Sequence, residues 1–354
     1  RWFSKTIGST AIGAEAGYYT TGSYNTFMGY KAGHGGTTSA PYSSGETNTA
    51  VGYNALGAFT TGWGNVAIGY ATGDAINTGY RNVLVGRSAG TALTSAEDVV
   101  AIGYEALSTE TGATRQVSIG YRANMQQSGA GLNGNVGIGW AAGYFNKTGV
   151  ANTTIGFRAG YGTSNISNGN NVFIGYDSGY AVGNGGSNVA VGNSTLANVK
   201  SGSAIVAIGQ EAGRYATGSY NTFVGYQSGL GGTTSAPYSS AQYNTAIGYQ
   251  ALKGFTSGTG RNVAIGYQAA VASTTGRDNV IIGYEAGHDI TSTVETVLIG
   301  AYAGTKLNSA DANGTVVIGM NALSTATDAV NNVMIGYEAG VKLKTDDNVA
   351  IGFR

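Results

Sequence analysis

Residues 262–269 read Asn-Val-Ala-Ile-Gly-Tyr-Gln-Ala, and residues 65–72 read Asn-Val-Ala-Ile-Gly-Tyr-Ala-Thr. Variants of this phrase recur along the whole chain of 354 residues. A short fixed period is typical of a solenoid, because one repeat unit cannot bury its own apolar face and must stack on its neighbours. The central glycine returns twenty times, usually seventeen residues after the previous copy, at Gly13, Gly29, Gly52, Gly69, Gly86, Gly103, Gly120, Gly139, Gly156, Gly175, Gly192, Gly209, Gly225, Gly248, Gly266, Gly283, Gly300, Gly319, Gly336 and Gly352.

The three residues before each glycine indicate a strand. Ile, Val or Met directly precedes the glycine, Val or Thr stands two positions earlier, and the residue between them is mostly small or apolar. This spacing of β-branched residues favours a strand, and apolar residues on both of its faces are typical of a strand buried on both sides. We expect Val66 and Ile68 to stack inside the coil, and Ala67 to belong to a second apolar face. Two or three short strands are expected in each coil.

The second apolar face needs a cover that such a thin coil cannot supply itself. Its small residues, including the glycine, suit the close approach of backbones around a rotation axis. The sequence therefore predicts an all-β fold, a β-solenoid or β-roll of about twenty short coils, in which three identical chains lie side by side as a homotrimeric fibre.

Asparagine and tyrosine form two further columns of the repeat. Asn precedes the strand in fourteen of the twenty copies, and Asn side chains stacked in register form an amide ladder. An aromatic residue usually follows the glycine, and stacked aromatic rings stabilise such ladders by packing; an exposed stripe that binds sugars or another surface is the alternative. The residues expected to form structural ladders include Ile68, Ile102, Ile208, Ile265, Asn65, Asn82, Asn262, Tyr70, Tyr104 and Tyr267.

A longer repeat of 196 residues divides the chain into two copies. The first, 1–196, holds about eleven coils with a protruding loop near 34–47, and the second, 197–354, is an incomplete copy of about nine coils with a loop near 230–243. Both loops lie in coils of 23 residues and carry the two prolines of the chain, which cannot pair in a ladder. Insertions in solenoids often lie on the binding face, although a recent duplication would also preserve a loop without a function. The candidate binding residues are Thr37, Thr38, Pro41, Tyr42, Thr233, Thr234, Pro237 and Tyr238.

Composition excludes several classes of function. The net charge is zero and the charged residues are scattered, so no basic stripe exists to bind nucleic acid. The two histidines, His34 and His288, lack a second ligand at metal spacing, and no cysteine is present. Glu105 is expected to lie near Arg87 and Arg122 of the two neighbouring coils, in solvated ion pairs that contribute little. We expect no catalytic residues, no cofactor, no metal and no membrane insertion, and hence no enzyme. Because both ends fall inside repeats, we expect a piece of a longer polypeptide.

The phrases at 244–251 and 262–269 resemble the haemagglutinin-type head repeats of trimeric autotransporter adhesins. They are equally similar to repeats of bacteriophage tail fibres that end in an endosialidase-type chaperone. The resemblance covers essentially the whole chain. It implies a left-handed β-roll, three chains side by side, and attachment to a host surface or matrix.

These observations favour a structural and adhesive extracellular fibre segment, either a phage tail-fibre shaft or a bacterial surface adhesin head, which presents or spaces a receptor-binding site. Such a segment would lie on a cell surface or a virion fibre, with a host glycan or protein as partner. A self-assembling extracellular filament is the alternative hypothesis. An ice-binding solenoid and a polysaccharide-degrading tailspike are weaker ones, because the threonines lie mainly at turns and no pair of carboxylates stands out.

Overall fold

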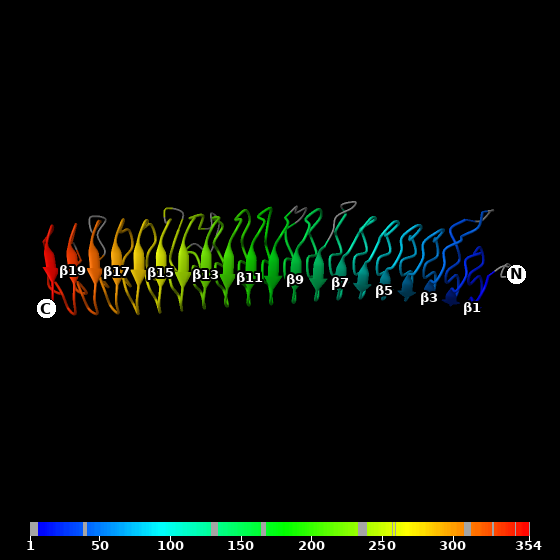
Figure 1. Cartoon of the computed structure of the whole chain (residues 1–354), viewed down its shortest axis with the longest axis horizontal. Coiled ribbons are helices and arrows are strands. Elements are labelled where there is room, and N and C mark those ends of the chain that lie inside the picture. The colour runs from blue at the N-terminus through cyan, green and yellow to red at the C-terminus, as the bar shows by residue number, and fades with distance from the viewer. Residues whose placement is uncertain are drawn as a thin grey trace. The chain divides into compact units, whose positions relative to one another are not determined.

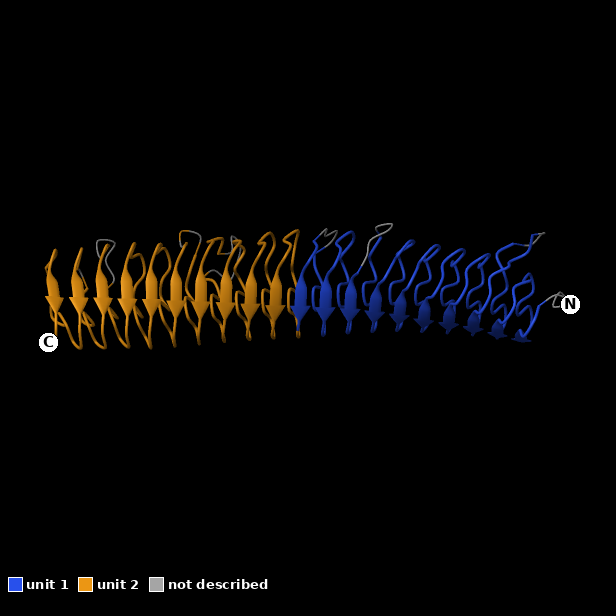
Figure 2. Ribbon diagram, in the orientation of Figure 1, with its two compact units in different colours: residues 1–174 blue, residues 175–354 orange. Residues whose placement is uncertain are grey.

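A computed structural model describes the chain as two compact units, residues 1–174 and 175–354 (Figure 2). Regular structure consists of short strands, and no helix is found within the described residues. The duplication boundary after residue 196 is a property of the sequence, and the unit boundary does not test it. The described residues are 6–37, 41–128, 134–163, 168–232, 239–256, 258, 260–307, 313–327, 329–343 and 345–353.

Each unit contains strands of three residues, one before each repeat glycine (Figure 1). In the first unit these are β1 (Thr10–Ile12), β2 (Thr26–Met28), β3 (Thr49–Val51), β4 (Val66–Ile68), β5 (Val83–Val85), β6 (Val100–Ile102), β7 (Val117–Ile119), β8 (Val136–Ile138), β9 (Thr153–Ile155) and β10 (Val172–Ile174). In the second unit they are β11 (Val189–Val191), β12 (Val206–Ile208), β13 (Thr222–Val224), β14 (Thr245–Ile247), β15 (Val263–Ile265), β16 (Val280–Ile282), β17 (Val297–Ile299), β18 (Val316–Ile318), β19 (Val333–Ile335) and β20 (Val349–Ile351).

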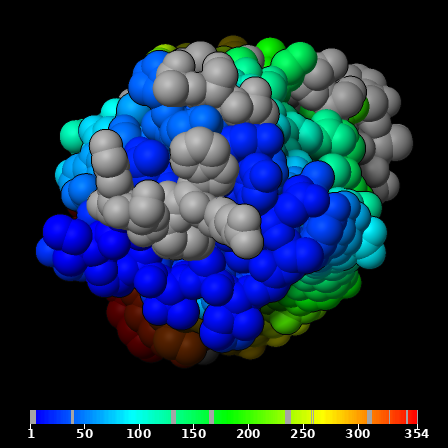
Figure 3. Space-filling model, turned by 90° about the vertical axis from the view of Figure 1, so that its right-hand side faces the viewer, coloured from blue at the N-terminus to red at the C-terminus, as the bar shows by residue number. Residues whose placement is uncertain are grey.

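Successive strands of a unit pair in parallel, with equivalent repeat positions opposite one another. In β4 and β5, for example, Val66 pairs with Val83 and Ile68 with Val85. Viewed from the N-terminal end of the first unit, the atoms of successive coils follow one another from blue to cyan (Figure 3). The prediction of an all-β solenoid with coils of about seventeen residues is confirmed.

The prediction of two or three strands per coil is wrong, because the described part of each coil holds one. The backbone turns away from extended geometry directly after the strand, where Ala71 and Gly73 have φ angles of 48° and 54°. Hydrogen bonds between coils continue all the same, as the Gly73 amide donates to the Ala89 carbonyl at 3.0 Å. The remainder of the described coil is therefore a stack of turns, with isolated parallel bridges such as Tyr80 to Glu97 and Glu97 to Thr114 in place of a second set of strands.

The assignment of the two strand faces is also wrong, and the structure reverses it. The middle strand residue points into the coil, where Ala67 and Leu84 are fully buried, whereas Ile68 on the outer face is 40% exposed. Large side chains from the turns complete the interior, and the ring of Phe59 lies 5.7 Å from that of Phe27, the middle residue of β2. The middle residue is alanine in nine of the twenty strands, and larger middle residues such as Phe27 and Met334 are buried there as well. The first and third residues, mostly Val, Ile or Thr, face outward.

The repeat glycine is required by contacts within one chain. Gly69 has a φ angle of 140°, which side chains rarely adopt. A Cβ atom there would lie 2.6 Å from the carbonyl oxygen of Gly86 in the next coil. Repeat glycines therefore allow successive coils to stack closely at the end of the strand.

A buried asparagine ladder joins the coils beside the strands. The Asn65 side-chain oxygen accepts from the Asn82 backbone amide at 3.1 Å and from its side-chain amide at 2.9 Å. The Asn65 side chain itself donates to the Asn48 side-chain oxygen at 3.1 Å and to the Gly79 carbonyl at 2.9 Å. In the second unit, Asn262 donates to the Asn244 side chain at 3.1 Å in the same way. These bonds satisfy polar groups that the coil buries.

Candidate binding surfaces

The first candidate surface is the outward face of the strands, formed by the first and third residue of each, which we term the outward Val/Ile face. Ile68 and Ile208 are more than one third exposed, and Ile102 and Ile265 are partly exposed. Parallel sheets are usually covered on both faces, and a continuous apolar surface commonly marks an interaction site. This face is therefore the best candidate for contact with another protein surface.

The second candidate surface is the aromatic column beside that face. Tyr70 stacks on Tyr53 with ring centroids 4.9 Å apart and planes within 8°. Tyr267 stacks between Tyr249 and Tyr284 at 5.0 and 4.9 Å. Neighbouring rings cover both faces of such a tyrosine and leave only its edge and hydroxyl exposed. A sugar ring needs a free aromatic face, so the inner part of the column is suited to packing rather than to sugar binding.

At one coil the column continues through an arginine that replaces the aromatic residue. The Arg87 guanidinium lies 5.6 Å from the Tyr70 ring centroid and 5.7 Å from that of Tyr104. Tyr104 in turn stacks on Tyr121 at 5.3 Å. The cation thus occupies the gap between two rings and maintains the stack by cation–π attraction.

The insertion in the first unit packs on an aromatic cluster. Tyr42 stacks on Tyr19 at 6.1 Å, and the His34 ring lies 5.0 Å from Tyr19. The Thr37 and Ser43 hydroxyls are hydrogen-bonded at 3.3 Å. Pro41 lies in the same segment and is exposed. The other loop candidates, Thr38, Thr233, Thr234, Pro237 and Tyr238, lie outside the described residues.

A pocket lies directly after the insertion in each copy of the long repeat. In the first unit it has a volume of about 460 Å³ and is lined by Ser44, Gly45, Glu46, Thr47, Thr61 and Trp63. In the second unit it has a volume of about 320 Å³ and is lined by Ser240, Ala241, Gln242, Tyr243, Gly258, Gly260, Arg261 and Arg277. Both pockets begin with the equivalent segment, 44–47 and 240–243. A surface pocket therefore follows the insertion in each copy of the long repeat.

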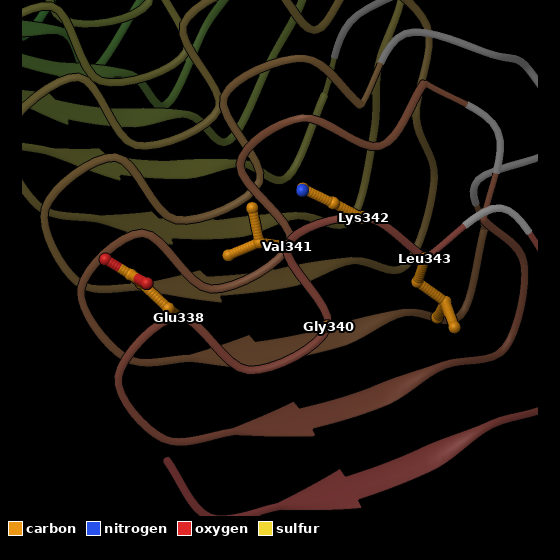
Figure 4. Close-up of a pocket in the computed structure, with 5 residues that line it drawn as sticks. All are labelled: Glu338, Gly340, Val341, Lys342 and Leu343. Carbon is orange, nitrogen blue, oxygen red and sulfur yellow. The ribbon is translucent and has the colours of Figure 1, made fainter. Parts of the chain in front are cut away.

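A larger pocket of about 620 Å³ lies in the coil after β19 (Figure 4). It is lined by Glu338, Gly340, Val341, Lys342 and Leu343. Leu343 occupies the repeat position that Leu93 and Ile290 fill in the buried core of other coils. The pocket thus lies at core positions of the solenoid and is not a cleft formed for a ligand.

Charged side chains pair between neighbouring coils. Arg122 donates to Glu105 at 2.7 Å, as predicted from the repeat, and Arg81 donates to both carboxylate oxygens of Asp98 at 2.6 and 2.8 Å. The hydrogen bond from Arg81 lowers the pKa of the Asp98 carboxyl below its ordinary value of 3.8. Within the described residues no cluster of three or more histidine, cysteine or acidic side chains could hold a metal ion. These charged groups thus act as surface ion pairs between coils, whereas Arg214 pairs with Glu211 within one coil.

Sequence reasoning missed two residues of the pocket in the first unit, Glu46 and Trp63. Both stand six positions before a repeat glycine. The residue type at this repeat position varies from coil to coil, so the repeat pattern does not single it out. Aligning that position would have placed them in neighbouring coils. The sequence thus indicates that Glu46 and Trp63 are neighbours, but the pocket between them depends on the geometry of the turns.

Comparison with models of known protein families found no match, and a search of curated proteins found no similar sequence. In the described part of the chain, no helix is long and apolar enough to cross a membrane. The functional argument therefore rests on the fold and on the surfaces above.

Proposed function

We propose that this chain is a structural and adhesive segment of an extracellular fibre, which assembles as a homotrimer and presents receptor-binding loops. The outward Val/Ile face carries the proposal. It runs along the strands of each unit and combines β-branched residues that a soluble monomer would expose to water.

Assembly with further copies of the chain would cover this face. Identical faces can close around a rotation axis without leaving one of them uncovered. The resemblance to trimeric adhesin heads and tail fibres favours three copies. Scattered charges and a net charge of zero are compatible with association through apolar contacts.

The adhesive role is supported by the insertions. A stack of coils with an amide ladder is suited to act as a stiff spacer, and its two insertions interrupt an otherwise regular surface. In this proposal the spacer holds the insertions away from its anchor on a bacterial or virion surface, where they attach to a host or matrix glycan or protein.

The native mass measured by light scattering during size-exclusion chromatography tests the assembly. We expect three chains for the natural sequence and one folded chain for the double variant Ile102→Asp, Ile265→Asp, because each aspartate would place a charge in an apolar interface. Thr78→Asp, an exposed turn residue, is the matched control and should remain trimeric. A folded single chain or a dimer of the natural sequence would contradict the proposal.

A further inference from the structure

The pocket after the first insertion contains an aromatic ring with an unusual environment. Trp63 is 45% exposed, and its ring is parallel to that of Tyr80 within 2°, with centroids 5.2 Å apart. Arg81 also approaches, with its guanidinium carbon 5.7 Å from the Trp63 ring. Tyr80 and Arg81 both belong to the following coil, so the described contacts of the Trp63 ring lie on one side.

The opposite face of Trp63 is directed at the preceding coil. Residue 63 is adjacent to that coil at Glu46, whose carbonyl accepts from the Gly64 amide at 3.0 Å. Glu46 provides no ring, and no other aromatic side chain of the described residues covers this face. The pocket of about 460 Å³ lies on this side, since four of its six lining residues are 44–47 of the preceding coil. One face of the indole is therefore open to a ligand.

Polar groups line the pocket together with Trp63. Glu46 and the hydroxyl residues Ser44, Thr47 and Thr61 line the pocket and are exposed. Glu46 forms no ion pair within the described part of the chain, whereas Asp98 and Glu105 are paired with arginines. Its carboxylate is thus free to accept hydrogen bonds from a ligand.

We propose that this pocket binds a neutral sugar residue, with the apolar face of the sugar ring on Trp63 and its hydroxyl groups on Glu46 and the neighbouring hydroxyls. The polarised C–H groups of a pyranose are attracted to the negative face of an indole, and a carboxylate accepts hydrogen bonds from sugar hydroxyls. An apolar wall with a few polar groups is the usual composition of a small-molecule site. As an account of what the fibre attaches to, this inference rests on the proposed function.

A cationic ligand fits the pocket less well. Sites for quaternary ammonium groups surround the cation with an aromatic cage, whereas this pocket offers a single ring. Its hydroxyl groups would also have no role toward such a cation. They match a ligand that carries several hydroxyls.

The pocket in the second unit lacks these features. Gln242 stands at the position equivalent to Glu46, two arginines line the wall, and no tryptophan is present among its lining residues. Tyr243 is the ring in that wall and stacks on Tyr220 at 5.1 Å, but the lining residues around it offer two arginines and no carboxylate to a ligand. We therefore expect one sugar site per chain, in the first unit.

Saturation-transfer NMR on the whole chain tests this inference, with methyl β-glucoside, methyl β-galactoside and diacetylchitobiose as sugar probes and choline as the cation probe. At least one sugar should bind at concentrations up to roughly 10 mM, with one site per chain. Trp63→Ala should weaken binding by about tenfold or more, and Glu46→Gln by about tenfold. Trp63→Tyr retains a ring and should bind better than Trp63→Ala, and circular dichroism checks that each variant folds.

Trp140→Ala is the matched control. Trp140 is 44% exposed, but Tyr121 and Phe157 stack on its two sides at 5.6 and 4.9 Å, so its removal should leave binding unchanged. No sugar binding, binding that Trp63→Ala leaves intact, or binding of choline alone would overturn the inference. The native mass of the same samples separates the two proposals. A trimer that binds no sugar would contradict only the sugar site, and a monomer that binds sugar would contradict only the trimeric assembly.

Discussion

At the scale of single residues, the repeat is dictated by backbone conformation as much as by hydrophobicity. Non-glycine residues at positive φ recur along the described coils, among them Ala71 at 48° and Arg81 at 56°. The repeat glycine adopts a wider angle, 140° at Gly69, in close contact with the next coil. Left-handed positions of the first kind tolerate side chains at a moderate cost, whereas the second kind is restricted to glycine.

Gly69→Ala tests this difference. The new Cβ would lie 2.6 Å from the Gly86 carbonyl oxygen and 2.7 Å from the Thr72 hydroxyl oxygen. We expect a loss of about 3 kcal/mol in the free energy of unfolding of the first unit, measured by urea denaturation. Gly64→Ala is the control, because its φ is 65° and its nearest neighbours are 3.8 Å away, so about 1 kcal/mol is expected. Equal losses in the two variants would contradict the proposed role of the close contact.

At the scale of the structural element, the parallel ladder is stabilised by asparagine side chains, which form equivalent hydrogen bonds in successive coils. Asn65 is fully buried and takes part in bonds to both adjacent coils. Its oxygen and its amide both act within the ladder, so its removal leaves partners on two sides without a bond. An element of this kind derives its stability from the whole column.

Asn65→Ala should therefore cost about 2 to 3 kcal/mol in the free energy of unfolding, because buried donors and acceptors lose their partners. The same denaturation experiment measures it. Asn77→Ala replaces an exposed asparagine in the next coil and should change stability by less than about 0.5 kcal/mol. A loss at Asn77 as large as that at Asn65 would show that burial of the ladder is not the cause.

The ion pairs between coils predict a measurable titration. Arg81 holds the pKa of Asp98 below 3.8, so the stabilising effect of the pair is present above that value and is lost as the pH falls through the lowered pKa. Arg81→Met should raise the Asp98 pKa toward its ordinary value, as followed by NMR of the carboxyl carbons. Asp278, whose pKa is lowered by Arg261 in the second unit, should titrate unchanged. An Asp98 pKa that does not rise would rule out the hydrogen bond as the cause.

At the scale of the whole molecule, the two faces of the strand have different consequences. The inner face holds each unit together, with Ala264 fully buried, and the outer face, with Ile265 partly exposed, is available for association. Substitutions on adjacent residues should therefore affect different properties. Folding depends on the first and assembly on the second.

Ala264→Asp and Ile265→Asp separate these properties. An uncompensated charge inside the coil should cost more than about 4 kcal/mol and abolish the native circular dichroism of the second unit. Ile265→Asp should keep the native spectrum, but its melting temperature should no longer rise with protein concentration, as a trimer requires. Loss of structure in both variants would mean that the β-branched residues also point into the interior, and would refute the face assignment.

Much of the candidate surface could be read from the sequence. The aromatic and asparagine columns and the position of the insertions follow from the repeat, because parallel stacking places equal repeat positions side by side. The pocket at Trp63 could not be read in this way. It depends on which face of one ring is left uncovered by the variable residues of the adjacent coils.

By itself, the sequence determined the parallel solenoid, its period and the place of each strand, because a repeated pattern of β-branched residues and glycine can bury its apolar surface only by stacking on its own copies. Only the tertiary structure decided which apolar face lies inside. Both faces carry apolar side chains, so hydrophobicity alone does not separate them. The difference comes from packing: middle residues, from Ala67 to Phe27, fill the interior together with the large turn residues, while Ile68 faces outward.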